Sequence, residues 1–137
     1  MTVAHFTLAY WSVLVAALLP IVCAGIAKWG MFSKSGREGG FDNNDPRAWL
    51  ARQTDWRARA NAAQANSFEA LPLFIGAVII AHQLGAYQPR LDLLAIIYVA
   101  LRMVYIMLYV ANLANLRSLV WTLALAVNVA ILFVGDR

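Results

Sequence analysis

The chain has 137 residues, of which 62% are hydrophobic and 13% charged, and its formal net charge is +4. Soluble domains carry about 25% charged residues, so this composition indicates an integral membrane protein and argues against a soluble enzyme. At this length we expect a single domain over residues 1–137. Because basic residues also set membrane topology, the positive charge gives no reason to expect a nucleic acid partner.

Four apolar segments follow one another along the chain, and each nears the roughly 20 residues that a helix needs to cross a bilayer. The first lacks the basic start and short apolar run of a cleaved signal peptide, so we expect it to remain as a span. The sequence predicts an all-α fold, a four-helix transmembrane bundle, with spans near residues 6–29, 56–84, 90–113 and 116–135.

The loop between the first two spans is the longest polar stretch. Asp45 followed by Pro46 is typical of a helix start, with a capping carboxylate and then proline at the first helical position. We predict a short helix from Pro46 to about Arg52 that lies along the lipid headgroups, with Trp49 and Leu50 as its anchors.

Basic side chains gather on one side of the predicted bundle. The loop of residues 30–55 and its flanks carry Lys28, Lys34, Arg37, Arg47, Arg52, Arg57 and Arg59. Arg117, in the turn after the third span, lies on the same side, and the opposite side has only Arg90 and Arg137. The positive-inside rule therefore predicts a cytoplasmic loop and two termini on the non-cytoplasmic side.

Two polar residues lie inside the second span. Asn66 and Glu69 are three residues apart and share one helix face. The free energy of inserting a carboxylate at the middle of a bilayer is unfavourable by about 2.5–3.5 kcal/mol. We therefore expect Glu69 to face the bundle interior and to mark a functional site.

The third span carries the complementary groups. Arg102, Tyr105 and Tyr109 follow i, i+3, i+7 spacing and form one stripe. At about 1.5 Å per residue, Glu69 and Arg102 lie at matching depth on antiparallel helices, and we predict an ion pair between them. With Arg117 at the cytoplasmic mouth, these residues outline a polar pocket. The ion pair has a second interpretation, in which it is purely structural and only fixes the register between the two helices.

Other polar residues have simpler interpretations. We expect Asn128, near the middle of the fourth span, to hydrogen-bond between helices and not to bind a ligand. For Tyr109 taken by itself, the commoner explanation is a residue of the aromatic belt at a membrane surface. Cys23 is expected to be a buried, inert thiol, and the sequence suggests no metal site.

Two stretches resemble signature motifs of the membrane-associated proteins in eicosanoid and glutathione metabolism, the MAPEG family. They are residues 59–74, with Asn66, Glu69 and Pro72-Leu73-Phe74, and the series Arg102-x-x-Tyr105-x-x-x-Tyr109 followed by Leu116-Arg117-Ser118. The resemblance covers the four-helix layout and is that of a bacterial-type member, which implies the inner membrane. It also implies a homotrimer with sites between neighbouring subunits.

The resemblance implies glutathione as co-substrate and a lipophilic small molecule as its reaction partner. The residues that match the family's glutathione contacts are Asn66, Glu69, Tyr105 and Tyr109. Arg117 matches the arginine that stabilises the glutathione thiolate, which makes Arg117 and Tyr109 the candidate catalytic residues. Arg59 and Lys28 are further candidates for binding the glutathione carboxylates.

One departure keeps two functions open. The eicosanoid enzymes carry an arginine four residues before the motif asparagine, where this chain has Ala62. The leading interpretation is a membrane-bound glutathione-dependent transferase or peroxidase that acts on lipophilic electrophiles. The alternative is a non-catalytic trimer that binds lipid or a protein partner through the same pocket. A proton or ion carrier ranks last, because the spans lack a second deep acidic group for a relay.

Overall fold

The computed structural model describes residues 5–137 as an antiparallel bundle of four long helices. These are α1 (Leu8–Ala27), α3 (Asp55–Gln83), α4 (Gln88–Val110) and α5 (Ala114–Phe133). Each is long and apolar enough to cross a membrane, so the predicted all-α bundle and the multi-pass membrane location are confirmed. The first four residues of the predicted domain lie outside the described residues.

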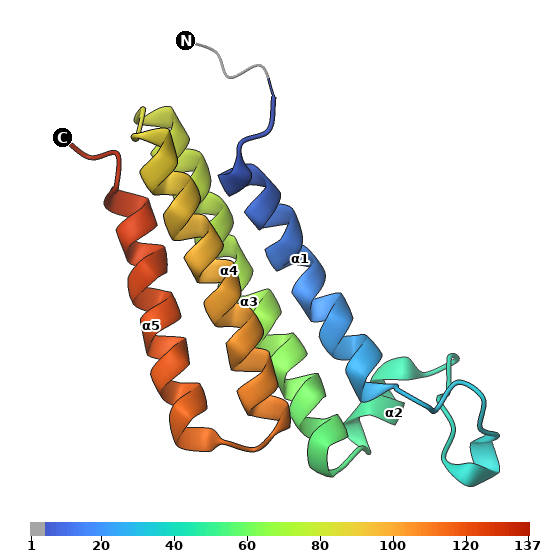
Figure 1. Cartoon of the computed structure of the whole chain (residues 1–137). Coiled ribbons are helices and arrows are strands. Elements are labelled where there is room, and N and C mark those ends of the chain that lie inside the picture. The colour runs from blue at the N-terminus through green and yellow to red at the C-terminus, as the bar shows by residue number, and fades with distance from the viewer. Residues whose placement is uncertain (1–4) are drawn as a thin grey trace.

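The helices pack with α3 and α4 in the middle, where α1 contacts both from one side and α5 contacts both from the other (Figure 1). The start of α1, the end of α5 and the α3–α4 turn lie at one end of the bundle, here called the termini end. The short helix α2 (Pro46–Ala51), the loop before it and the α4–α5 turn lie at the other, here called the α2 end.

The loop between α1 and α3 is ordered and folds against the bundle. A 3₁₀ turn, η1 (Gly36–Glu38), precedes α2, and the Asp45 carboxylate accepts from the Ala48 N–H, so the predicted helix start is confirmed. The predicted headgroup anchors are wrong, because Trp49 and Leu50 are only 3% and 9% exposed. Both pack inside the protein, with Ala27 and Ala60 in one buried cluster.

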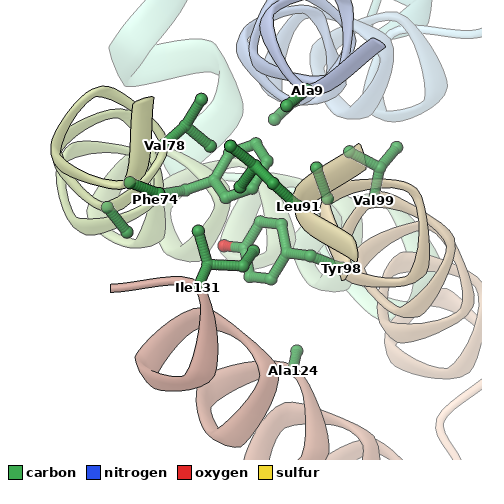
Figure 2. Close-up of a cluster of buried hydrophobic side chains, with 12 residues drawn as sticks. Ala9, Phe74, Val78, Leu91, Tyr98, Val99, Ala124 and Ile131 are labelled. Carbon is green, nitrogen blue, oxygen red and sulfur yellow. The ribbon is translucent and has the colours of Figure 1, made fainter. Parts of the chain in front are cut away.

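The core is built from small residues and a few large ones. In Figure 2, Phe74 of α3 stacks on Tyr98 of α4, with ring centroids 4.2 Å apart, and Leu91 and Ile131 pack around them. Fully buried alanines such as Ala77 let the helices approach closely, as is common in membrane bundles.

Arginines from the start of α3 hold the α2 end together. Arg57 Nη1 donates to the Ala27 carbonyl at the end of α1, 2.9 Å away, and Arg59 Nε donates to the Val110 carbonyl at the end of α4, 3.1 Å away. A cation at a helix C-terminus satisfies a free carbonyl and complements the helix dipole. These two bonds fix α1 and α4 relative to α3.

A different polar network joins three helices at the termini end. Thr7 Oγ1 lies 2.9 Å from His82 Nε2, and Gln88 Nε2 donates to Asp92 Oδ1 at 2.7 Å. The same Asp92 oxygen accepts from the Ala9 N–H at 2.9 Å, which ties α4 to the first turn of α1. These polar groups are satisfied by one another.

Candidate functional site

A cavity of about 430 Å³ lies toward the α2 end, between α3, α4 and α5. It is here called the mouth cavity. The residues that line it include the predicted Asn66, Tyr105, Tyr109, Arg117 and Ser118, together with Trp121 and Thr122. The fold therefore brings the motif residues of three helices to one space.

The α4–α5 turn positions Arg117. Asn112 has φ of 62°, a left-handed conformation that asparagine tolerates better than most residues, and it reverses the chain after α4. Arg117 then falls in the first turn of α5, where its N–H donates to the Leu113 carbonyl. Its guanidinium lies over the Tyr109 ring, 4.2 Å from the centroid, so the cation is held at the cavity wall by a face contact.

Two tyrosines form the α4 wall of the mouth cavity. The rings of Tyr105 and Tyr109 meet edge to face with centroids 5.7 Å apart. Tyr105 is only 4% exposed, whereas Tyr109 is half-buried. Their phenol groups can donate and accept hydrogen bonds, which suits them to contact a polar ligand.

The predicted ion pair between Glu69 and Arg102 is wrong. Arg102 is 3% exposed, and its Nη2 donates to Asn66 Oδ1 at 2.8 Å, while its guanidinium lies 4.3 Å from the Tyr105 ring centroid. Glu69 is exposed. Residues three apart on a helix are rotated by about 60° from each other, so Asn66 of α3 reaches Arg102 of α4 while Glu69 lies at the exposed edge of α3.

A second cavity, of about 190 Å³, adjoins the mouth cavity and is here called the deep chamber. It shares Asn66 and Trp121 with the mouth cavity. The other polar residues that line it are Glu69, Tyr98, Arg102 and Asn128. Glu69 and Arg102 thus face a common space without bonding to each other.

Asn128 was expected to hydrogen-bond between helices, and this prediction is wrong for the described residues. The side chain is 3% exposed, and its Oδ1 has no hydrogen-bond partner in residues 5–137. Sequence reasoning missed Asn128 as a cavity residue. The sequence does contain a pattern that could have predicted this role. Trp121, Leu125 and Asn128 follow i, i+4, i+7 spacing, which places them on one face of α5.

Neither Arg59 nor Lys28 reaches the mouth cavity. The Arg59 side chain is engaged at the end of α4 through Val110, and Lys28 Nζ lies 4.5 Å from the centroid of the Phe41 ring. Ala62 lines a separate outer groove of α3. Within the described chain, Arg117 is the one basic side chain that lines the mouth cavity. Residues 5–137 contain no group of three or more His, Cys, Asp and Glu side chains suited to a metal ion.

The chain was compared with known proteins. A sequence profile of the MAPEG family matches residues 8–135, which takes in all four long helices and both cavities. No curated protein and no solved structure matches the chain.

Proposed function

We propose that this chain, which belongs to the MAPEG family, is a membrane-bound glutathione-dependent transferase or peroxidase that acts on lipophilic electrophiles. The observation that carries the proposal is the mouth cavity, where Asn66, Tyr105, Tyr109, Arg117 and Ser118 converge from three helices. Its volume of about 430 Å³ falls within the range of small-molecule sites.

Glutathione binds in the mouth cavity with its thiol beside Arg117. A guanidinium next to a thiol favours the charged form and lowers the pKa of the thiol, so more of the nucleophile is present near neutral pH. Tyr109, under the same guanidinium at 4.2 Å, is placed to share a hydrogen bond to the sulfur. Asn66 and Tyr105 contact the peptide, and the electrophile arrives from the bilayer.

The exposed Glu69 supports assembly into a homotrimer. An ionised carboxylate that faced lipid from the middle of a span would cost about 2.5–3.5 kcal/mol. Since Glu69 is exposed in a single chain, we infer that a neighbouring copy covers this face of α3 and completes the binding site. From the basic residues near the α2 end we infer that this end faces the cytoplasm of a bacterial cell and that both termini lie on the outer side of the inner membrane.

One observation favours the alternative function. Glutathione carries two carboxylates, yet Arg117 alone supplies a cation to the mouth cavity of the described chain, and Ala62 faces elsewhere. A neutral or singly charged ligand suits such a cavity better. On this alternative, the trimer binds lipid or a protein partner and catalyses no reaction.

Titration of the purified protein with glutathione decides between the two functions. The enzyme proposal expects saturable heat by calorimetry and thiolate ultraviolet absorbance at neutral pH, with conjugation of an aromatic electrophile. A protein that shows neither binding nor conjugation at millimolar glutathione would support the non-catalytic trimer.

A further inference from the structure

The outer face of α1 carries an apolar groove that neither the core nor the mouth cavity uses. Its volume is about 630 Å³, and it is here called the α1 groove. The residues that line it come from the end of α1 and from the chain just after it, and they are Val22, Gly25, Ile26, Trp29, Gly30 and Phe32. Among the large apolar side chains of residues 5–137, Trp29 and Phe32 are the most exposed, at 75% and 69%. An exposed apolar patch of this kind indicates that another molecule covers it.

The loop that carries Phe32 is held in place at the α2 end. The Phe41 N–H donates to the Met31 carbonyl at 3.0 Å, which closes the loop, and the Trp49 Nε1–H donates to the Gly39 carbonyl at 3.2 Å. The Phe41 ring contacts two other rings, with its centroid 5.3 Å from that of Phe32 and 5.2 Å from that of Trp49. Phe32 is therefore exposed on a fixed support.

Positive charge lies at the same end of the α1 groove. Lys28 Nζ lies over the Phe41 ring, 4.5 Å from its centroid, so Lys28 and the groove residue Phe32 pack on the same ring. Lys34, two residues after Phe32, is exposed. The groove therefore changes along its length. It is aliphatic beside the last two turns of α1, and it is aromatic and basic beyond the end of the helix.

A phospholipid presents its groups in the same order. Its acyl chain is apolar, its glycerol region lies at the depth where tryptophan is enriched, and an anionic headgroup attracts Lys and Arg beside a span. At about 1.5 Å per residue, Val22 lies roughly 9 Å deeper in the membrane than Lys28. One lipid can therefore contact both ends of the groove.

We propose that the α1 groove binds one anionic phospholipid, whose acyl chain lies along Val22 and Gly25 and whose phosphate pairs with Lys28 and Lys34. This surface differs from the α3 face at Glu69, because Glu69 lines the deep chamber together with residues of α5. The helix α1 packs against α3 and α4 from the opposite side (Figure 1). The site goes beyond the proposed glutathione function and does not depend on it.

Tryptophan quenching in lipid nanodiscs tests the proposal on the full-length protein. The probe is brominated phosphatidylglycerol, present as a small fraction in unbrominated phosphatidylcholine, with bromine on the acyl carbons nearest the glycerol. Brominated phosphatidylcholine is the control. The anionic lipid should quench at an about 25-fold lower mole fraction, since each of two lysines near the membrane surface contributes about fivefold. Trp29→Phe should remove this selective component, whereas Trp11→Phe, at an exposed tryptophan of the termini end, should keep it.

Further variants test charge and space separately. Lys28→Gln and Lys34→Gln should each lower the preference for phosphatidylglycerol about fivefold, and Arg90→Gln, at an exposed position of the termini end, should leave it unchanged. Gly25→Leu fills the α1 groove, because a Cβ at Gly25 would meet no atom within 4 Å, and it should abolish the selective quenching. Gly76→Leu makes the same change at a glycine of α3 whose Cβ would also meet nothing within 4 Å, and it should keep the selective quenching.

Three results would overturn the proposal. Equal quenching by the two brominated lipids in the wild-type protein would mean that the groove meets bulk lipid without recognising a headgroup. Selective quenching that persists in Gly25→Leu would place the anionic lipid elsewhere. A Trp29 that neither lipid quenches, or a smaller oligomer for Gly25→Leu than for wild type by light scattering, would show that another copy of the chain covers the groove. Each result leaves the glutathione titration unaffected, so failure of the lipid site is distinguishable from failure of the proposed enzyme.

Discussion

The polar side chains of the termini end and those that line the mouth cavity are used in opposite ways. At the termini end, Thr7, His82 and Asp92 bond to neighbouring side chains or to the α1 backbone, so their polar atoms are satisfied within the protein. Toward the α2 end, Tyr109 and Arg117 contact each other through a ring face and leave their polar atoms at a cavity wall. The number of polar residues in a span is therefore a poor guide to function. A better guide is whether their polar atoms are already hydrogen-bonded within the protein.

This difference also separates stability from function. A polar group that bonds within the bundle stabilises the fold, and its removal should lower stability. A polar group at a cavity wall has its partner in a ligand, so its removal should lower binding or rate with little effect on folding.

The largest effect is expected at Arg117. Arg117→Ala should lower the conjugation rate with an aromatic electrophile about 100-fold, because a positioned donor that stabilises charge at the reacting atom contributes on this scale. Glutathione affinity should fall much less, since the interaction is made mainly in the transition state. Steady-state kinetics and calorimetry on the same preparation measure both quantities. Arg90→Ala, a matched change at an exposed arginine of the termini end, should keep wild-type rates.

A loss of stability is expected at the termini end. Asp92→Ala removes the acceptor for the Ala9 N–H and for Gln88 Nε2, and it should lower the free energy of unfolding by roughly 2–3 kcal/mol. Denaturation in mild detergent measures the change, and glutathione binding by the folded fraction should be unaltered. Asp42→Ala, which loses one exposed hydrogen bond to Asn44, should cost less than about 0.5 kcal/mol. Equal losses in the two variants would contradict a structural role for the network.

A double-mutant cycle tests the partner of Arg102. The cycle of Asn66→Ala with Arg102→Met should show a coupling of about 1.5 kcal/mol, because the two side chains share a partly buried hydrogen bond of 2.8 Å. The cycle of Glu69→Gln with Arg102→Met should show a coupling below about 0.5 kcal/mol. A larger coupling energy in the Glu69 cycle than in the Asn66 cycle would contradict this assignment and support the Glu69–Arg102 ion pair predicted from the sequence.

The smallest effect is expected at Arg59. Arg59→Ala removes the bond to the Val110 carbonyl at the end of α4 and should lower the free energy of unfolding by about 1 kcal/mol. Glutathione affinity should remain within about twofold of wild type, because the side chain does not line the mouth cavity. Arg52→Ala, at an exposed position of the same end, is the control. A selective loss of glutathione affinity in Arg59→Ala would show that Arg59 contacts the ligand after all.

The sequence predicted the fold and the mouth cavity better than it predicted individual contacts. The motif spacing on α3, α4 and the start of α5 predicted that Asn66, Tyr105 and Arg117 line one pocket, and the structure agrees. This prediction was possible because helix periodicity and the depth of a residue in a span both follow from residue number. The partner of Arg102 was missed, since a depth count does not specify helix rotation. The burial of Trp49 was missed for a similar reason, because an aromatic residue near a span end suits either lipid or protein.

What the sequence determined by itself is the set of spanning helices, their approximate ends and the identity of the residues at the level of the mouth cavity. These follow from hydropathy, capping residues and a constant rise per residue. The tertiary structure alone decided which polar groups bond to each other and which face a cavity. That outcome depends on the rotation and packing of three helices at once, so Asn66 took the hydrogen bond that Glu69 was expected to accept and Asn128 was left at the wall of the deep chamber.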